Sequence, residues 1–186
     1  IRNVIRVKLG LDAIPHMLAV LSHCASPMLL GIAECLRAPV LADISAEIGL
    51  VLDESISNTK NVRIQAVFAV RTGRNGLLDL ARKAFSENIS DMHEHVEKLR
   101  EQSKLGKLAL TTTASRGYHL TLPSNGIQAQ KLGDQFIQIH HAGKLIRLST
   151  NTLVELNARA NECLSDIWTL TDSELSALME VLWAKE

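Results

Sequence analysis

The fold is decided by one stretch of 28 residues, LLDLARKAFSENISDMHEHVEKLREQSK, at positions 77–104. From Phe85 onward its apolar residues recur in steps of four and three, which predicts a helix with a single apolar seam. Because charged residues occupy the other faces, this helix must either project or lie against one partner helix. The seam consists of Leu78, Phe85, Ile89, Met92, Val96 and Leu99.

A second stretch, at positions 150–183, has the same spacing and predicts a returning helix. Thr152 and Glu155 form the capping-box pattern that marks a helix start. Thr171 and Glu174 repeat that pattern inside the stretch, where the apolar phase slips, and we expect a continuous helix with a bend there. The apolar positions of this helix are Leu153, Leu156, Ala160, Cys163, Ile167 and Leu170.

The residues between these helices, 105–149, have alternating apolar and polar positions and several turns, which predicts a small sheet. In its second strand Tyr118, Leu120 and Leu122 face one way, whereas His119 and Thr121 face the other. The simplest topology is four antiparallel strands inserted between two helices. The strands are expected at 107–113, 116–122, 136–141 and 144–149.

Residues 1–76 predict shorter helices. Residues 1–10 are expected to end a helix at Gly10, and Pro27 is expected to start another, with Ser26 as its N-cap. Polar residues 53–61 indicate a connector, and β-branched residues in 62–71 favour an extended, strand-like segment. The further helices are expected at about 11–24, 27–37 and 40–52. The fold class is therefore mainly α with a small inserted antiparallel β-sheet.

Composition places the chain among folded proteins. Of its 186 residues 46 % are hydrophobic and 22 % charged, which argues against wholesale disorder. Cys24, Cys35 and Cys163 form no CxxC pair, so we expect buried, unpaired thiols in a reducing compartment. No signal peptide or membrane-spanning run is visible. Since the chain starts at Ile1 rather than Met, we interpret it as a fragment of a longer protein.

Motifs for covalent chemistry are absent from the sequence. There is no phosphate loop, no GxGxxG and no GxSxG elbow. His93 and His95 lie two residues apart on a helix, and His140 and His141 point to opposite sides of a strand, so neither pair predicts a metal site. We therefore expect no cofactor, no metal and no enzymatic activity in this segment. A solvated helix face accounts for Glu94, Glu97 and Glu101.

The charge is distributed unevenly along the chain. The net charge is zero, yet residues 104–148 hold six cations and one acid, a formal charge of +5 that the rest must offset. Cationic side chains unopposed by acids suit phosphate contacts that do not read sequence, although a solvated surface without function would look the same. The candidate DNA-backbone contacts are Lys104, Lys107, Arg116, His119, Lys131, Lys144 and Arg147, with Asn125, His140 and His141 as weaker donors.

Local residue patterns add a resemblance to a known family. Gly73 precedes LLDLAR at 77–82, RGYHLTL stands at 116–122, and GKLIRLST at 143–150 leads into TLVELN at 152–157. In this order and spacing they resemble the lever and clamp region of MutS proteins. They are similar to the glycine turn into the first lever helix, the clamp strand with its glycine–aromatic pair, and the strand and cap that start the returning helix.

The resemblance extends over essentially the whole chain. It implies a helical, MutS core-like segment at 1–76, lever helices at 77–104 and 150–186, and a β clamp at 105–149. Within the family, FAVR at 68–71, LARKA at 80–84 and ASRGY at 114–118 most resemble the fourth eukaryotic MutS homologues, the meiotic subgroup. The sequence VRTG ending at Gly73 departs from the arginine–glutamate–glycine of mismatch-repair members.

The resemblance implies a nuclear, ATP-driven sliding clamp on double-stranded or branched recombination DNA that promotes crossovers. Its ATPase, with ATP and Mg, would lie outside this chain, and its partner would be another MutS homologue, the fifth. No membrane is implied. The alternatives are a fragment of a mismatch-repair MutS homologue and a structural coiled-coil module without DNA binding. That module would bind another protein through Leu78, Phe85, Met92 and Leu99.

Overall fold

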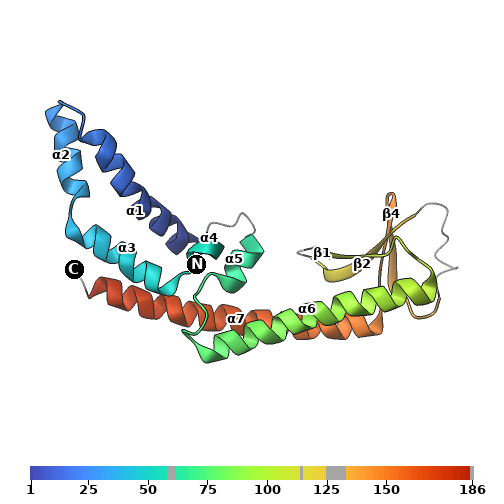
Figure 1. Cartoon of the computed structure of the whole chain (residues 1–186). Helices are drawn as coiled ribbons and strands as arrows, with labels where there is room; N and C mark the ends of the chain where they lie inside the picture. The colour runs from blue at the N-terminus through green and yellow to red at the C-terminus, as the bar shows by residue number, and fades with distance from the viewer. Residues whose placement is uncertain (58–61, 114, 125–132, 185–186) are drawn as a thin grey trace. The chain divides into compact units, whose positions relative to one another are not determined.

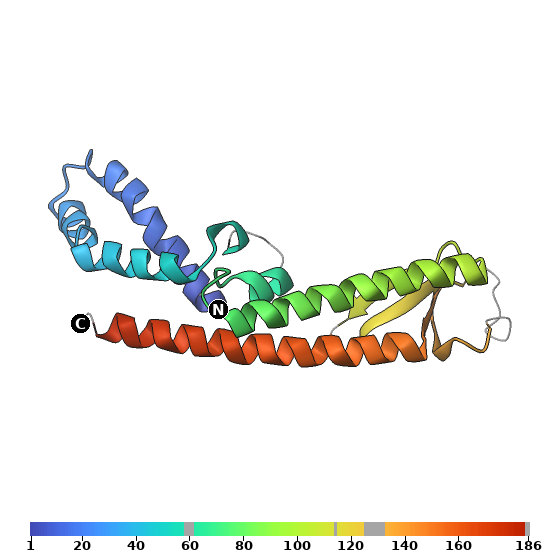
Figure 2. The same cartoon turned by 60° about the horizontal axis from the view of Figure 1, so that its bottom comes forward.

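A computed structural model describes residues 1–57, 62–113, 115–124 and 133–184, and shows a mostly helical chain with one sheet (Figures 1 and 2). This confirms the predicted fold class. The chain forms two compact units. We call Ile1–Asp79 with Asp166–Glu186 the helical unit, and Leu80–Ser165 the sheet unit. The division into core, lever helices and clamp stays a prediction.

The helical unit begins with three helices of moderate length: α1 (Arg2–Leu21), α2 (Pro27–Leu36) and α3 (Pro39–Val51). The expected break at Gly10 is wrong, because α1 continues through Gly10 and Pro15. An interior glycine costs a helix only about 0.5–1 kcal/mol, which the packing of α1 on α2 and α3 can offset. Pro27 starts α2 as predicted, but Ser26 caps it without a side-chain hydrogen bond.

The expected strand-like segment at 62–71 is also wrong. The structure has a short helix, α4 (Glu54–Ser57), then α5 (Val62–Phe68); residues 58–61 lie outside the described part. Only Val70 is extended, in an isolated antiparallel bridge with Leu52. Val67 is buried from the helix and Val70 from the bridge that follows it, so packing overrode the β-propensity over most of this segment.

Two long helices carry the predicted seams: α6 (Gly76–Ser103) and α7 (Asn151–Trp183). Both match the expected ranges to within about one residue. At the start of α6 the Asn75 side chain accepts hydrogen bonds from the backbone N–H groups of Leu77 and Leu78, each at 3.1 Å. The helix ends before Lys104, whose φ of 55° is the left-handed conformation typical of a helix terminus.

The predicted cap of α7 needs correction. Thr150, and not Thr152, caps the helix, because its hydroxyl oxygen accepts the backbone N–H of Leu153 at 3.1 Å. The helix then continues without a break through Thr171. In the second capping-like pattern, Thr171 to Glu174, the glutamate has another role. Within the helical unit its carboxylate accepts hydrogen bonds from the side chains of Arg74 at 2.7 Å and Asn75 at 3.0 Å.

The sheet unit contains four antiparallel strands in the order β1-β2-β4-β3. They lie at the end of the unit where α6 finishes and α7 begins (Figure 1). Each strand starts and ends within two residues of its prediction. The strands are β1 (Ala109–Thr113), β2 (Gly117–Pro123), β3 (Ile137–Ala142) and β4 (Leu145–Ser149).

The core of the sheet unit joins both helical seams and one face of the sheet. Within this unit α6 and α7 run side by side (Figures 1 and 2), and His95 Nε2 lies 2.8 Å from Thr150 Oγ1 between them. The coiled-coil alternative requires the α6 seam to be exposed for binding another protein. In the structure this seam is buried inside the chain, which argues against that alternative. The buried seam and sheet residues include Phe85, Met92, Val96, Leu99, Leu120, Leu122, Ile146, Leu148, Leu153, Leu156 and Ala160.

Candidate nucleic-acid interface

The sheet has one apolar and one polar face. Leu120 pairs with Leu148 and Leu122 with Ile146, and all four side chains are buried on the apolar face. The alternation predicted for the second strand is therefore confirmed. On the other face Thr121 is paired in register with Arg147, which in turn pairs with His140.

The polar face presents hydroxyl and cationic groups together. Thr111 and Thr121 lie on neighbouring strands with their hydroxyl oxygens 2.9 Å apart. Arg147 is exposed in the middle of this face, and His140 is exposed beside it. A face of this composition can donate hydrogen bonds to an anion, while the opposite face supplies the core.

Strand register divides the predicted cations between the two ends of the sheet. Arg116 precedes Gly117, which pairs with Thr113 at one end. Lys144 lies at the other end, where its carbonyl oxygen accepts the N–H of Ser124 at 2.9 Å. At ~3.3 Å per residue the length of β2 separates these two ends by about 20 Å. A single point contact cannot use both ends, whereas a long polyanion can.

Five of the predicted cations fall within the described residues, and there none of them forms an ion pair. Four are exposed, and the fifth, Arg116, is half-buried. Their charges are therefore not neutralised by neighbouring acids in the described part of the chain. Lys131 and Asn125 lie outside the described residues. The five are Lys104, Lys107, Arg116, Lys144 and Arg147.

The prediction for His119 needs correction. Its ring is only 3 % exposed, so it is not presented to a phosphate. The ring turns back on its own strand, with Nδ1 3.0 Å from the carbonyl oxygen of Gly117. Because a carbonyl oxygen can only accept, Nδ1 carries the proton, and the buried Nε2 has no hydrogen-bond partner among the described residues. His140 and His141 are exposed and lie on opposite faces, as predicted.

The helix charges near the sheet behave as a solvated surface. Lys98 and Glu94 form an i,i+4 pair at 2.6 Å, and the hydrogen bond from Lys98 lowers the pKa of Glu94. Burial lowers the pKa of His95, and the nearby Lys98 charge lowers it further. His95 is therefore uncharged at neutral pH and adds nothing to the cationic surface.

One residue that sequence reasoning missed is Asn157 of α7. Its side-chain oxygen accepts the backbone N–H of Tyr118 at 3.1 Å. The contact joins the first turn of the sheet to a helix 39 positions away in sequence. The glycine at 117 is the residue type that favours a left-handed backbone, and the structure gives it a φ of 67°. No pattern in the sequence identified Asn157 as the residue that contacts this turn.

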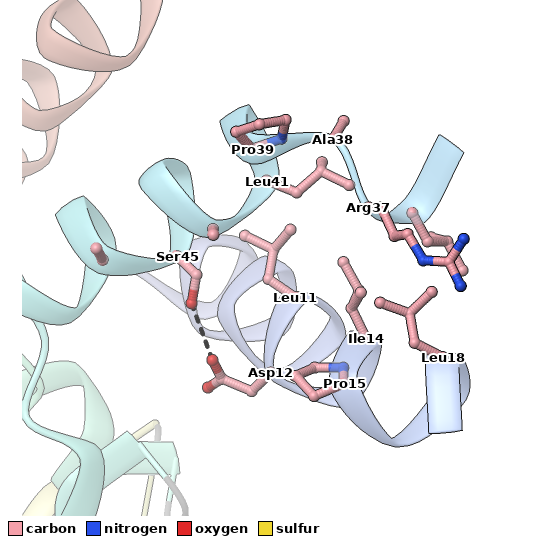
Figure 3. A pocket seen from close by; sticks show the side chains of 13 residues that line it. Leu11, Asp12, Ile14, Pro15, Leu18, Arg37, Ala38, Pro39, Leu41 and Ser45 are labelled. Atoms are coloured by element: carbon pink, nitrogen blue, oxygen red, sulfur yellow. Dashed lines mark hydrogen bonds between the residues drawn. The ribbon is translucent and has the colours of Figure 1, made fainter. Parts of the chain in front are cut away.

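A separate hollow in the helical unit lies between α1 and the α2–α3 region (Figure 3). It encloses about 560 Å³, and leucine, isoleucine and proline side chains dominate its lining. Its acid, Asp12, accepts hydrogen bonds from Lys8 at 2.6 Å and from Ser45 at 2.9 Å. Burial raises the pKa of Asp12, but these two bonds outweigh burial and lower it. The hollow is therefore no site for a polyanion.

Other classes of site find little support in the described residues. No group of three or more His, Cys, Asp or Glu side chains within 1–57, 62–113, 115–124 and 133–184 is placed to hold a metal ion. None of the helices in these ranges is long and apolar enough to cross a membrane. All three cysteines are free, but none is buried as expected, because Cys35 is exposed and Cys24 and Cys163 are half-buried.

Comparison with known proteins decides the family. The model of MutS family domain IV matches residues 73–166, which hold the sheet, all of α6 and the first half of α7. The chain belongs to the MutS family. The family resemblance read from residues 73–82, 116–122 and 143–157 is thereby confirmed.

Individual MutS relatives support the fourth-homologue subgroup. "DNA mismatch repair protein MSH4" of Arabidopsis thaliana is 29 % identical over 98 % of this chain and 23 % of its own length. "MutS protein homolog 4" of Mus musculus is 25 % identical over 92 % of this chain and 18 % of its own length. The Homo sapiens protein of that name is 24 % identical over 92 % of this chain and 19 % of its own length. The chain spans about a fifth of the length of these relatives.

Proposed function

We propose that this MutS chain is a lever and clamp whose sheet contacts the DNA backbone without reading its sequence. The observation that carries the proposal is the set of five cations without ion pairs in the described part of the sheet region. Their spread over both ends of the sheet suits double-stranded or branched DNA, which offers phosphates along its whole length. Contacts of this kind position a protein on DNA, while base contacts would be needed to read sequence.

The physical basis is counterion release. Each phosphate that a lysine or arginine neutralises contributes about −0.9 to the slope of log affinity against log salt. Five such contacts on a duplex give a slope of about −4.5, so binding weakens steeply as salt rises. The polar face adds the Thr111 and Thr121 hydroxyl groups, but because one donates to the other, at most one of their two protons is free for a phosphate.

For the full-length protein we extend the proposal to the meiotic subgroup that its relatives support. It binds ATP and Mg²⁺ in an ATPase outside this chain. It also pairs with a second MutS homologue, the fifth, and acts in the nucleus to promote crossovers. The chain itself takes part through DNA contact and has no catalytic step of its own.

The test is charge reversal in the full-length heterodimer. Changing Lys107, Arg116, Lys144 and Arg147 to Glu should lower retention on end-blocked duplex DNA more than tenfold and reduce the magnitude of the salt slope by about 3.6. The measurement is dissociation from the DNA at several salt concentrations.

A matched control reverses four exposed cations outside the sheet, Arg2, Arg6, Lys83 and Arg159, with the same change in net charge. This variant should retain the salt slope of the unmodified protein. Unchanged retention of the sheet variant at moderate salt would show that the sheet is not the DNA contact.

A mismatch-repair role is the second candidate, because the name of the Arabidopsis thaliana relative contains "DNA mismatch repair". The two roles differ in the DNA structure preferred by the full-length protein. The meiotic assignment predicts tighter binding to a four-way junction than to a duplex with one mismatched pair, and the reverse order would favour mismatch repair.

A further inference from the structure

We propose that Asn157 on α7 is a positioning residue that holds the turn between β1 and β2 and thereby presents Arg116 to the DNA backbone. The inference rests on the proposed function of the sheet. It concerns one of the five cations, and it names the contact through which a helix controls that cation.

The contact between Asn157 and the turn is unusually close. A Cβ atom added to Gly117 would lie 2.7 Å from Asn157 Oδ1 and 2.8 Å from Asn157 Nδ2. Real Cβ atoms do not approach neighbours this closely, so only glycine admits the carboxamide here. In the space this leaves, Oδ1 accepts the backbone N–H of Tyr118 at 3.1 Å.

The turn geometry transmits this contact to Arg116. Thr113 and Gly117 are register partners, so the turn between β1 and β2 ends at Arg116. Short hairpin turns are commonly completed by a residue in the left-handed conformation, and Gly117 adopts it with a φ of 67°. One peptide bond joins Arg116 to Gly117, so fixing the Gly117 backbone limits the directions open to the guanidinium group.

The turn is held from the strand side as well. The carbonyl oxygen of Gly117 accepts a hydrogen bond from Nδ1 of His119 at 3.0 Å, and that ring is buried. The polar groups on the C-terminal side of Arg116 therefore have fixed partners, one on α7 and one on β2. The backbone next to Arg116 is therefore fixed on one side, which restricts where its side chain can lie. The backbone of a cation on an unsupported loop has no such restraint.

The other hairpin turn provides the contrast. Gly143 also has a left-handed φ, 61°, but an added Cβ would meet nothing within 4 Å. Lys144, which follows it, is exposed and has no corresponding helix contact among the described residues. Asn157 should therefore influence the DNA contact of Arg116 and leave that of Lys144 unaffected.

A double-mutant cycle tests this in the full-length protein assembled with its MutS partner. Asn157→Ala and Arg116→Gln should each weaken binding to an end-blocked duplex about fivefold and reduce the magnitude of the salt slope by up to about 0.9. Combined, they should weaken binding no more than R116Q alone. With Lys144→Gln in place of R116Q, the two effects should instead multiply.

The outcomes separate the two proposals. Unchanged binding in both R116Q and K144Q overturns the proposed function of the sheet. A weakened R116Q whose effect multiplies with that of N157A leaves that function intact and overturns the positioning role.

A structural readout accompanies the binding data. The Tyr118 amide should exchange with deuterium faster in N157A, while the amides of β4 keep their protection. Unchanged Tyr118 exchange counts against the inference. If N157A does not fold, Asn157→Ser, whose hydroxyl is one bond shorter than the amide oxygen, replaces it in the same cycle.

Discussion

In the described part of the sheet unit, three large apolar side chains are exposed, at Leu80, Leu145 and Val154. The helical unit exposes many more, on all three of its longer N-terminal helices and on the last part of α7. They include Val7, Leu9, Met17, Val20, Met28, Leu30, Ile32, Val40, Leu50, Trp168, Met179, Val181 and Trp183. The two units therefore differ in how many large apolar side chains they expose.

The difference shows where the functions of the surfaces lie. In the sheet unit each apolar seam finds a partner within the unit, and most of the described surface is polar or charged. Single exposed apolar residues are normal in proteins, but a concentration of them marks a contact surface of another kind. We therefore assign the proposed binding of a charged polymer to the sheet unit, where cations without ion pairs face outward in the described part of the chain.

The largest expected effect tests this contrast directly. Leu120 in β2 is fully buried, whereas Leu50 in α3 is 63 % exposed. Leu120→Ala should lower the free energy of unfolding by about 2–5 kcal/mol, because it removes packed methyl groups and leaves a cavity. Leu50→Ala should change it by no more than about 0.5 kcal/mol. Urea denaturation measures both, and equal losses would break the comparison.

The next effect sharpens the account of the sheet unit itself. Gly117→Ala and Gly143→Ala both place a Cβ in the left-handed region, which costs about 1–2 kcal/mol. Only Gly117→Ala also displaces Asn157. It should therefore destabilise the protein by at least about 1 kcal/mol more than its control, because the Tyr118 hydrogen bond is lost as well. If the two variants lose the same stability in thermal unfolding, the close contact between Gly117 and Asn157 does not contribute to stability.

The smallest effect concerns pH at the junction of α6 and α7 in the sheet unit. Burial lowers the pKa of His95 in the folded state below the unfolded value of about 6.5, so the folded state binds fewer protons than the unfolded one. Stability should be complete above about pH 6.5 and decline as pH falls from there toward the folded pKa.

The control for this pH effect lies two residues away. His95→Gln should flatten the decline in unfolding temperature between pH 7.5 and 5.5, whereas the same change at exposed His93 should leave its slope unchanged. Thermal unfolding across this pH series measures both. If the unfolding temperature of H95Q declines with falling pH as much as that of the unmodified protein, groups other than His95 cause the decline.

Much of the fold was readable because apolar spacing reports burial. The three-and-four steps of 77–104 and 150–183 predicted α6 and α7 to within about one residue, and alternation predicted all four strands. The errors came where local signals compete with packing. Residues 62–68 form a helix that buries Val67, although β-branched residues favour a strand there, and Gly10 lies inside α1 because neighbouring helices support it.

The candidate site divides in the same way. Charge is a property of composition, so the cations of 104–148 could be identified without a structure. Exposure is not, and His119 was misjudged because alternation tells which side of a strand a residue faces but not whether that side is covered. The capping pattern at Thr152 was also real in sequence, yet the chain used Thr150 two residues earlier.

By itself the sequence determined the two long helices, the antiparallel strands between them, their excess of positive charge and the resemblance to MutS proteins. These depend on periodicity and composition, which act between residues close in the chain. Only the tertiary structure decided that Arg116 and Lys144 lie at opposite ends of the sheet, that His119 is buried, and that Asn157 meets Gly117. Those facts depend on strand register and on contacts between distant positions, which are set when the whole unit packs.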